Sequence, residues 1–440
     1  MKAPRAAGPA TGLATGQAIL SRRGFLATTA GAAAAAGAAT ALTAGGLASL
    51  ISACDSAAVN ADLLTQLPVP GPFNPVTWPI SARNRPIADG MRAEQDATLA
   101  VFTWPGRIAA QCLDKFARKH GCLVKLTTFG SMSDAIATLA SKNSRFDVLL
   151  GVPIATLGTV IGRNLVQPLN HSYIPNISQA WPQFTNPFYD QNWQYTVPYT
   201  IYTTGIGWRK DLVDADPYAM VNGWELLWNA KYTGRVAILD DYREAISLGL
   251  LAGGLADLNT PDPLLIDGAA SSLTELASLA RPKLDNTAFR QLATGRTWVQ
   301  HAWSGQIAAA IKNLPPGTPP DVLGYWFPPD GSGPVANDMI TIPRSAQNPV
   351  LAHLFMNFML DVPNAMTNAG GIGYMQPLRW MTPRRLVTHG ILPADLISTA
   401  VLEDYFYRCL KELQLPVATD ALWQQAFQSV VAHMQLAESS

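Results

Sequence analysis

Three short apolar runs alternate with three amphipathic segments between residues 99 and 161, and this order limits the possible folds more than any other feature of the chain. The apolar runs cover 99–103, 123–127 and 146–150, and the helical patterns cover 108–120, 133–141 and 154–161. Apolar residues on one face of a helix recur about every 3.6 residues, whereas a buried strand gives a short continuous run. Strands that alternate with helices favour a parallel sheet with helices on both faces, so we expect an α/β fold.

The same order recurs at 236–250, where four apolar residues lead into Asp240 and Asp241 and then into a helical pattern. The three-residue spacing of Asp241 and Glu244 places both carboxylates on one side of the first helical turn. This spacing is typical of a capping box, in which the two side chains only satisfy free backbone amides. It also describes an anionic ligand site at a helix N-terminus, and the local pattern leaves both interpretations open.

Three side chains occupy equivalent places, because Trp104, Asp241 and Trp303 each end an apolar run and precede a helical pattern. Ligands of open α/β sheets bind at the carboxyl ends of the strands. We therefore expect these three residues to share a ligand cleft. Other expected elements are strands near 195–199, 205–208, 298–303 and 338–342, and helices at 223–228, 306–311, 350–360 and 402–413.

The charge balance argues against a nucleic-acid partner. The chain has 31 basic and 31 acidic residues, and residues 1–53 contain four basic residues and no acid. Without that segment, 27 basic residues face 31 acidic ones. Nucleic-acid binding needs a basic surface, whereas a slightly acidic chain with 12 Trp is compatible with a cationic ligand.

The N-terminus has the features of an export signal. Ser21-Arg-Arg-Gly-Phe-Leu26 is a twin-arginine pattern, an Ala- and Gly-rich stretch follows, and Ile51-Ser-Ala-Cys54 resembles a lipobox. We expect 1–53 to be a twin-arginine lipoprotein signal peptide, with Cys54 lipidated and the protein anchored outside the cytoplasmic membrane. A transmembrane anchor is the alternative, but few bulky apolar side chains are present. Residues 54–95 are rich in Pro, Asn and Ala and predict a flexible linker.

No motif predicts an enzyme, a metal site or a cofactor. The chain contains no G-x-S-x-G, no H-E-x-x-H and no P-loop, and its six His lack metal spacing. Asp240 and Asp241 are adjacent on a strand end and face apart, so they do not form a glycosidase pair. His301 shares a strand face with Trp303 and is expected to pack or to support the site. A disulfide between Cys112 and Cys122 stays open for an exported chain.

Eight motifs follow one another between about residues 97 and 380. They are Val101-Phe-Thr-Trp104, Phe146-Asp-Val-Leu-Leu150, Tyr195-Thr-Val-Pro-Tyr199 with Gly205-Ile-Gly207, Gly223-Trp-Glu-Leu-Leu-Trp228 with Tyr232-Thr-Gly234, Leu239-Asp-Asp-Tyr-Arg-Glu244, Ala302-Trp-Ser-Gly305, Asp338 before Ile342-Pro343, and Gly371-Ile-Gly-Tyr374. In this order they resemble the bacterial spermidine/putrescine-binding proteins, the solute-binding components of polyamine ABC importers.

The resemblance implies a two-lobed periplasmic-binding-protein fold of type II, which closes around its ligand by hinge motion. Lobe 1 would take 96–201 plus 338–380, and lobe 2 would take 202–337 plus 381–440. The resemblance also implies a small cationic ligand of the polyamine class, a two-subunit membrane permease with an ATPase as partner, and a monomer.

The family's ring positions fall on Trp104, Trp303 and Tyr374. By resemblance, Trp104 would stack on the ligand, Trp303 would form a wall and Tyr374 would line the cleft. Rings bury the methylene chain of a polyamine and attract its charges.

The family's acids fall on Asp241, Glu244 and Asp338. By resemblance, Asp241 and Glu244 would bind one amino group and Asp338 another nitrogen. A buried ammonium group is costly without such partners.

Three positions depart from the family pattern. Arg107 stands where the family usually has a Tyr, Ala336 stands where it often has a Trp, and 151–154 lacks the usual hydroxyl and aromatic side chains. A cation at 107 opposes a polyamine, but it can bind a carboxylate in bidentate fashion. A zwitterionic, amino-acid-like or opine-like ligand is therefore an alternative, as is an interaction protein that has lost the ligand.

Overall fold

A nine-stranded sheet organises residues 67–439, the part of the chain that this computed structural model describes. The strand order is β2-β1-β3-β9-β4-β7-β5-β6, and β8 pairs with β4 beside this path. The strands are β1 (Thr98–Thr103), β2 (Leu123–Thr128), β3 (Val148–Pro153), β4 (Val197–Arg209), β5 (Val236–Ile238), β6 (Lys283–Leu284), β7 (Val299–Trp303), β8 (Leu323–Trp326) and β9 (Val335–Thr341).

Helices follow the strands in the expected alternation, which the order β1-α3-β2-α4-β3-α5 confirms. The helices are α3 (Ala110–His120), α4 (Met132–Ala140), α5 (Ile154–Gly162), α6 (Tyr242–Ala252), α7 (Pro263–Ala280), α8 (Phe289–Ala293), α9 (Ser304–Ala310), α10 (Pro349–Met359), α11 (Val362–Ile372), α12 (Pro383–Thr388), α13 (Tyr405–Arg408) and α14 (Val417–Ser439). The expected helix at 223–228 is a 3-10 helix, Gly223–Trp228.

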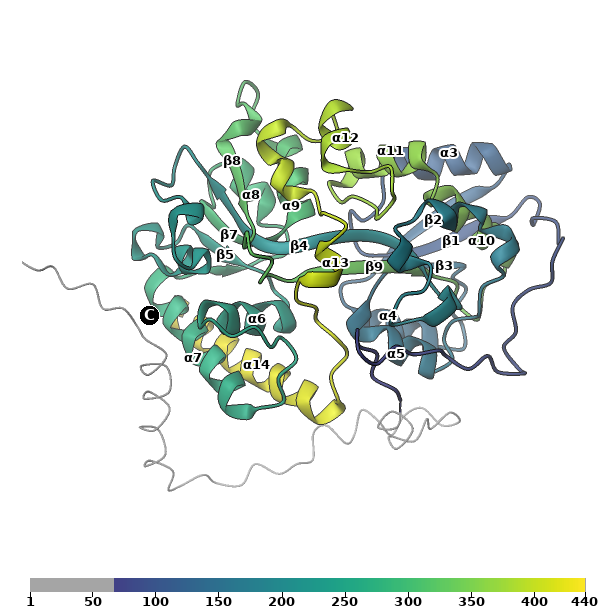
Figure 1. Cartoon of the computed structure of the whole chain (residues 1–440), viewed down its shortest axis with the longest axis horizontal. Helices are drawn as coiled ribbons and strands as arrows, with labels where there is room; N and C mark the ends of the chain where they lie inside the picture. Colours follow the sequence, from purple (N-terminus) through teal and green to yellow (C-terminus); the bar gives the residue numbers. More distant parts are fainter. Residues whose placement is uncertain (1–66, 440) are drawn as a thin grey trace, which may run out of the picture. The chain divides into compact units, whose positions relative to one another are not determined.

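The sheet is mixed, so the expectation of a parallel sheet holds only for its two ends. β1 pairs in parallel with β2 and β3, and β5 pairs in parallel with β6 and β7. Between these ends, β9 and β4 run antiparallel to each other and to their outer neighbours. They lie side by side through the middle of Figure 1. Two neighbouring parallel strands must be joined by a crossover connection. β4 and β9 are antiparallel to each other, and both pass from one half of the sheet to the other.

β4 joins the two halves within one strand. Residues 197–203 pair with β9, whereas 204–209 pair with β7 and β8. All 13 residues of β4 are buried. A continuous strand of this kind carries the chain across the boundary between the halves near Thr203 and Thr204.

Buried apolar side chains form two clusters, and the larger one extends from the first half into β7, β8, α8 and α9. The larger contains the core of β1, β3 and β9, and the other contains α6, α7 and α14. Trp423 of α14 is fully buried and donates a hydrogen bond from Nε1 to Thr260 O at 3.1 Å. The C-terminal helix is therefore part of the second core (Figure 1).

The expected helix at 402–413 is wrong. Only Tyr405–Arg408 is α-helical, and the chain beyond it is extended. Leu410 exchanges backbone hydrogen bonds with Gly333 and Val335, at 3.0 and 2.8 Å. This pairing with a segment distant in sequence satisfies the backbone and overrides the local helical pattern.

The segment before β1 packs on the rest of the protein where it is described. Trp78 is 2% exposed and donates from Nε1 to Tyr189 O at 2.8 Å. The twin-arginine pattern and Cys54 lie outside the described residues. Within 67–439 no helix is both long and apolar enough to cross a membrane.

The three described cysteines, Cys112, Cys122 and Cys409, are buried free thiols. The alternative of a bridge between Cys112 and Cys122 is therefore not realised. Burial raises the pKa of Cys112 to about 11, so this thiol is protonated at neutral pH and weakly reactive.

Candidate functional site

The guanidinium group of Arg107 lies among three aromatic rings. Its Cζ atom is 4.1 Å from the ring centre of Tyr374, 5.2 Å from that of Trp303 and 5.5 Å from that of Tyr202. These distances are within the range, up to about 6 Å, at which a ring attracts a cation. Arg107 is only 9% exposed. The rings expected to surround a ligand cation thus surround a cation of the chain itself.

Asp338 supplies the negative charge beside these rings. Arg107 Nη1 is 3.5 Å from Asp338 Oδ2, which also accepts a hydrogen bond from Thr200 Oγ1 at 3.0 Å. The Tyr202 hydroxyl donates to Asp338 Oδ1 at 3.4 Å. Burial raises the pKa of Asp338 above its usual value, although Arg107 opposes that shift. Arg107 therefore neutralises the acid expected to bind a ligand nitrogen.

Arg107 keeps its charge in this environment. Burial alone lowers its pKa, but Tyr374 and Asp338 outweigh that effect, and the net pKa lies above its usual value. Its Nη1 atom is buried and donates no hydrogen bond to any described residue. The group is thus a buried cation whose ionic partner in the described chain is Asp338.

The loop after β1 positions both Trp104 and Arg107. The Tyr199 hydroxyl donates to Arg107 O at 2.5 Å, and Trp104 Nε1 donates to Gly151 O at 2.8 Å. Gly151 has φ +94°, and a side chain there would collide with the Trp104 ring. Trp104 also packs edge-to-face on Phe129 at 4.7 Å. The described contacts of Trp104 are thus with Gly151 of β3 and with Phe129 rather than with the rings around Arg107.

Asp241 caps α6. Its Oδ1 atom accepts hydrogen bonds from the backbone amides of Arg243 and Glu244, at 2.9 and 3.2 Å. The capping interpretation of Asp241 is therefore confirmed. Burial raises the pKa of this carboxyl, although the two amides oppose the shift.

Glu244 connects α6 to the ring group. Its Oε1 atom accepts hydrogen bonds from Trp303 Nε1 and, at 3.1 Å, from Thr204 Oγ1. Its Oε2 atom is buried and has no hydrogen-bond partner in the described chain. Burial and the neighbouring Glu412 raise the pKa of Glu244 well above its usual value. Glu244 is thus a carboxyl that lacks a counter-ion.

His301 is buried next to Glu244, as expected for a packing or supporting residue. Its Nε2 atom is 3.9 Å from Glu244 Oε2, and the residue is 1% exposed. Burial lowers the pKa of His301 to about 3. The ring is therefore neutral at neutral pH and does not balance the charge of Glu244.

One face of β4 carries site residues that the sequence analysis missed. Thr200 and Tyr202 bond Asp338, and Thr204 bonds Glu244. Polar side chains at every second position of a strand share one face, so this alternation was the available signal. The third acid near α6, Glu412, had no such signal because it lies in the segment expected to be helical.

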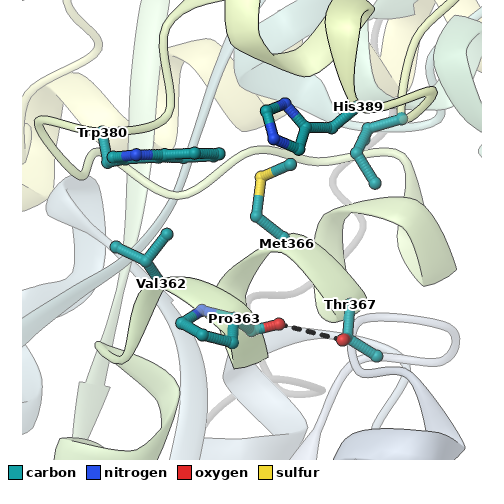
Figure 2. A pocket seen from close by; sticks show the side chains of 7 residues that line it. Val362, Pro363, Met366, Thr367, Trp380 and His389 are labelled. Carbon is teal, nitrogen blue, oxygen red and sulfur yellow. Dashed lines mark hydrogen bonds between the residues drawn. The ribbon is translucent and has the colours of Figure 1, made fainter.

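A separate hollow of about 590 Å³ lies between α11 and α12. Figure 2 shows the rings of Trp380 and His389 on one side of it and α11 on the other. It is lined by Val362, Pro363, Met366, Thr367, Trp380, His389 and Ile391. None of these side chains is an acid, so this hollow offers no counter-ion for an amine.

Known proteins are similar to this chain in sequence and in fold. Residues 111–379 match the family described as bacterial extracellular solute-binding protein. This chain belongs to that family. It is 28% identical to a spermidine/putrescine-binding periplasmic protein of Haemophilus influenzae over 64% of this chain and 76% of the relative. It is 29% identical to the spermidine/putrescine-binding periplasmic protein of Escherichia coli over 65% of this chain and 79% of the relative.

A solved structure confirms the fold of this solute-binding protein. The spermidine/putrescine ABC transporter substrate-binding protein PotD of Streptococcus pneumoniae superposes with a TM-score of 0.61 at 22% identity, covering 78% of this chain and all of that one. The predicted two-lobed type II fold and the resemblance to spermidine/putrescine-binding proteins are both confirmed. Membership of this family makes the chain a solute-binding protein rather than an enzyme. Among residues 67–439, no group of three or more His, Cys, Asp or Glu could hold a metal ion.

Proposed function

We propose that this protein is the extracytoplasmic solute-binding component of an ABC importer and that its ligand is a small aliphatic amine, the class to which putrescine and spermidine belong. The single observation that carries the ligand class is the Glu244 carboxyl. It is 7% exposed, and its Oε2 atom lacks a partner. A buried carboxylate without a counter-ion is costly, and a ligand ammonium group removes that cost.

In this proposal one ammonium group binds at Glu244 and Asp241. The ring of Trp303 forms a wall beside it, because Trp303 already donates to Glu244. Trp104 and Tyr374 complete the proposed cleft. The protein acts as a monomer that delivers the ligand to a two-subunit permease with an ATPase, and its lobes close by hinge motion about β4 and β9.

A second ligand class is favoured by Arg107. Its Nη1 atom forms no hydrogen bond within the described chain, and its charge lies 3.5 Å from Asp338. A zwitterion such as an ω-amino acid would place its ammonium group at Glu244 and its carboxylate at Arg107. A plain diamine would instead bring a second cation close to Arg107.

Calorimetric titration with putrescine, spermidine and 4-aminobutyrate tests both classes. We expect at least one of them to bind wild-type protein, and Glu244→Gln to weaken that binding by about tenfold or more, the effect of one lost charge-assisted hydrogen bond. If none of the three gives heat or a thermal shift, the proposal fails. A non-transport interaction protein on the same fold then becomes the better description.

We also propose that the protein is exported by the twin-arginine route and is held at the outer face of the cytoplasmic membrane by lipid on Cys54. Labelling of bacteria that express the gene with an alkyne fatty acid should mark the wild-type protein and leave Cys54→Ser unlabelled. Equal labelling of both, or retention of the wild type in the cytoplasm, contradicts this part of the proposal.

A further inference from the structure

An extended segment, residues 410–416, connects α13 to α14; we call it the strap. It lies beyond residue 379, where the family match ends. In Figure 1 it descends between α6 on one side and α5 on the other before α14 begins. The chain thus returns to the region between the two halves after residue 379.

Hydrogen bonds from the second half hold the strap in place. Arg243 Nη1 donates to Leu413 O at 2.8 Å. Asn259 donates from Nδ2 to Lys411 O at 2.8 Å and accepts from Leu413 N at 2.7 Å. These contacts pair three backbone groups of the strap, on the residues before and after Glu412, and so hold that residue in place.

The strap also contacts the first half. The side chain of Gln414 lies against Gly158 in α5, so closely that a Cβ atom at position 158 would collide with it. α5 follows β3, whereas α6 follows β5. The strap therefore lies between α5 and α6. Each of these helices follows a strand of its own half of the sheet.

Glu412 of the strap faces α6. Its Oε1 atom accepts a hydrogen bond from Ser247 Oγ at 2.9 Å, and Ser247 lies one turn after Glu244. Burial raises the pKa of Glu412, and Asp241 raises it further, while Arg243 opposes both effects. Glu412 in turn raises the pKa of Glu244. The three carboxyls are thus close enough to repel one another.

The only described cation among these acids does not pair with them. Arg243 donates to Leu258 O and to Asn259 Oδ1, both at 2.9 Å, in addition to Leu413 O. It forms no salt bridge with any acid of the described chain. No cation of the described chain therefore forms a salt bridge with Asp241 or Glu412, and the Oε2 atom of Glu244 accepts no hydrogen bond from the described residues.

We propose that the strap supplies Glu412 to the ligand site, where it binds the ligand's ammonium group together with Glu244 and Asp241. This inference rests on the proposed function. It adds a specificity-determining residue from outside the part of the chain that matches the family. An ammonium group has three donors, and three carboxyls around it can accept all of them.

The variant Glu412→Gln tests the inference, because Gln keeps the size of the side chain and the acceptor for Ser247. We expect putrescine or 4-aminobutyrate, whichever binds the wild type, to bind about tenfold more weakly. We also expect the melting temperature of the ligand-free variant to stay unchanged or to rise, because a mutual repulsion has been removed. The control is Glu403→Gln, an exposed acid of the same C-terminal part, which should leave both quantities unchanged.

The outcomes separate the two proposals. If Glu244→Gln weakens binding and Glu412→Gln does not, this inference is overturned and the proposed function stands. A fall in melting temperature with unchanged affinity gives Glu412 a structural role only, which also overturns it. If neither variant changes binding, or if the wild type binds none of the probes, the proposed function fails and the inference with it.

Discussion

At residue 107 the chain supplies its own cation to the aromatic group. Arg107 contacts the rings of Tyr202, Trp303 and Tyr374, and its charge lies 3.5 Å from Asp338. The rings and the acid therefore retain the properties of a cation site, while the side chain of Arg107 fills that site. Trp303 also donates a hydrogen bond to Glu244, whose Oε2 atom has no hydrogen-bond partner among the described residues.

Arg107→Tyr introduces the residue type that the resemblance to the polyamine-binding family implies at this position. We expect putrescine to bind about tenfold more tightly, as a change of ~1.4 kcal/mol gives, because a like charge is removed. A ligand with a carboxylate, such as 4-aminobutyrate, should bind at least about tenfold more weakly. Arg118→Tyr, on the exposed surface of α3, is the matched control in calorimetry. Weaker binding of both ligands would contradict the assigned role.

The Glu244 carboxyl predicts a pH dependence of stability. Its pKa is raised from 4.5 on folding, so the folded state holds this proton more tightly than the unfolded state. The contribution of Glu244 is then most favourable below about pH 4.5 and is lost as pH rises through the folded pKa. We expect the unfolding free energy of Glu244→Gln, relative to wild type, to increase from pH 4.5 toward neutral pH. A difference that is independent of pH in urea titrations would refute the shift.

At the scale of the element, the start of α6 combines two roles that the sequence left as alternatives. Asp241 caps the helix through Oδ1, and the same side chain lies beside Glu244 and Glu412. A helix N-terminus favours negative charge, so a capping carboxylate is also well placed to bind a cation. Capping is observed, and ligand binding by Asp241 stays a prediction.

Two substitutions of Asp241 separate these roles. Asn caps a helix about as well as Asp, whereas Ala costs roughly 1 kcal/mol. Asp241→Asn should therefore leave the unfolding free energy nearly unchanged but weaken amine binding, and Asp241→Ala should reduce both. Asp262, which caps α7 through Leu264 N, gives the control pair Asp262→Asn and Asp262→Ala. Wild-type affinity in Asp241→Asn would leave Asp241 with capping alone.

At the scale of the whole molecule, Arg107 links parts of the chain that the fold holds on opposite sides of β4 and β9. It follows β1 in one half, whereas Trp303 ends β7 in the other. β4 changes its pairing partners between Thr203 and Thr204. We therefore expect the contact of Arg107 with Trp303 to hold the two halves together without a ligand.

Removing that contact should open the ligand-free protein. We expect Arg107→Ala to increase the radius of gyration in small-angle X-ray scattering, and an amine ligand to reverse the increase, because hinge closure then depends on the ligand alone. The matched variant Arg118→Ala should behave as wild type. An unchanged radius of gyration in Arg107→Ala would show that other contacts hold the two halves together.

The sequence by itself determined the α/β class, the alternation from 99 to 161 and the junction at Asp241. These features follow from local periodicity and from side chains close together in the chain. The order of motifs also identified the family. The comparison with the family's motifs also predicted Arg107 as the main departure from that family. A changed residue type can be read from the sequence without a structure.

Only the tertiary structure decided where the site's charges are paired. The sequence placed Asp338 as a ligand acid, but its partner Arg107 is 231 positions away, and no local pattern reports such a contact. The antiparallel centre of the sheet and the extended strap were missed for the same reason. Leu410 pairs with Gly333 and Val335 across the fold, and long-range hydrogen bonds of this kind override a local helical pattern.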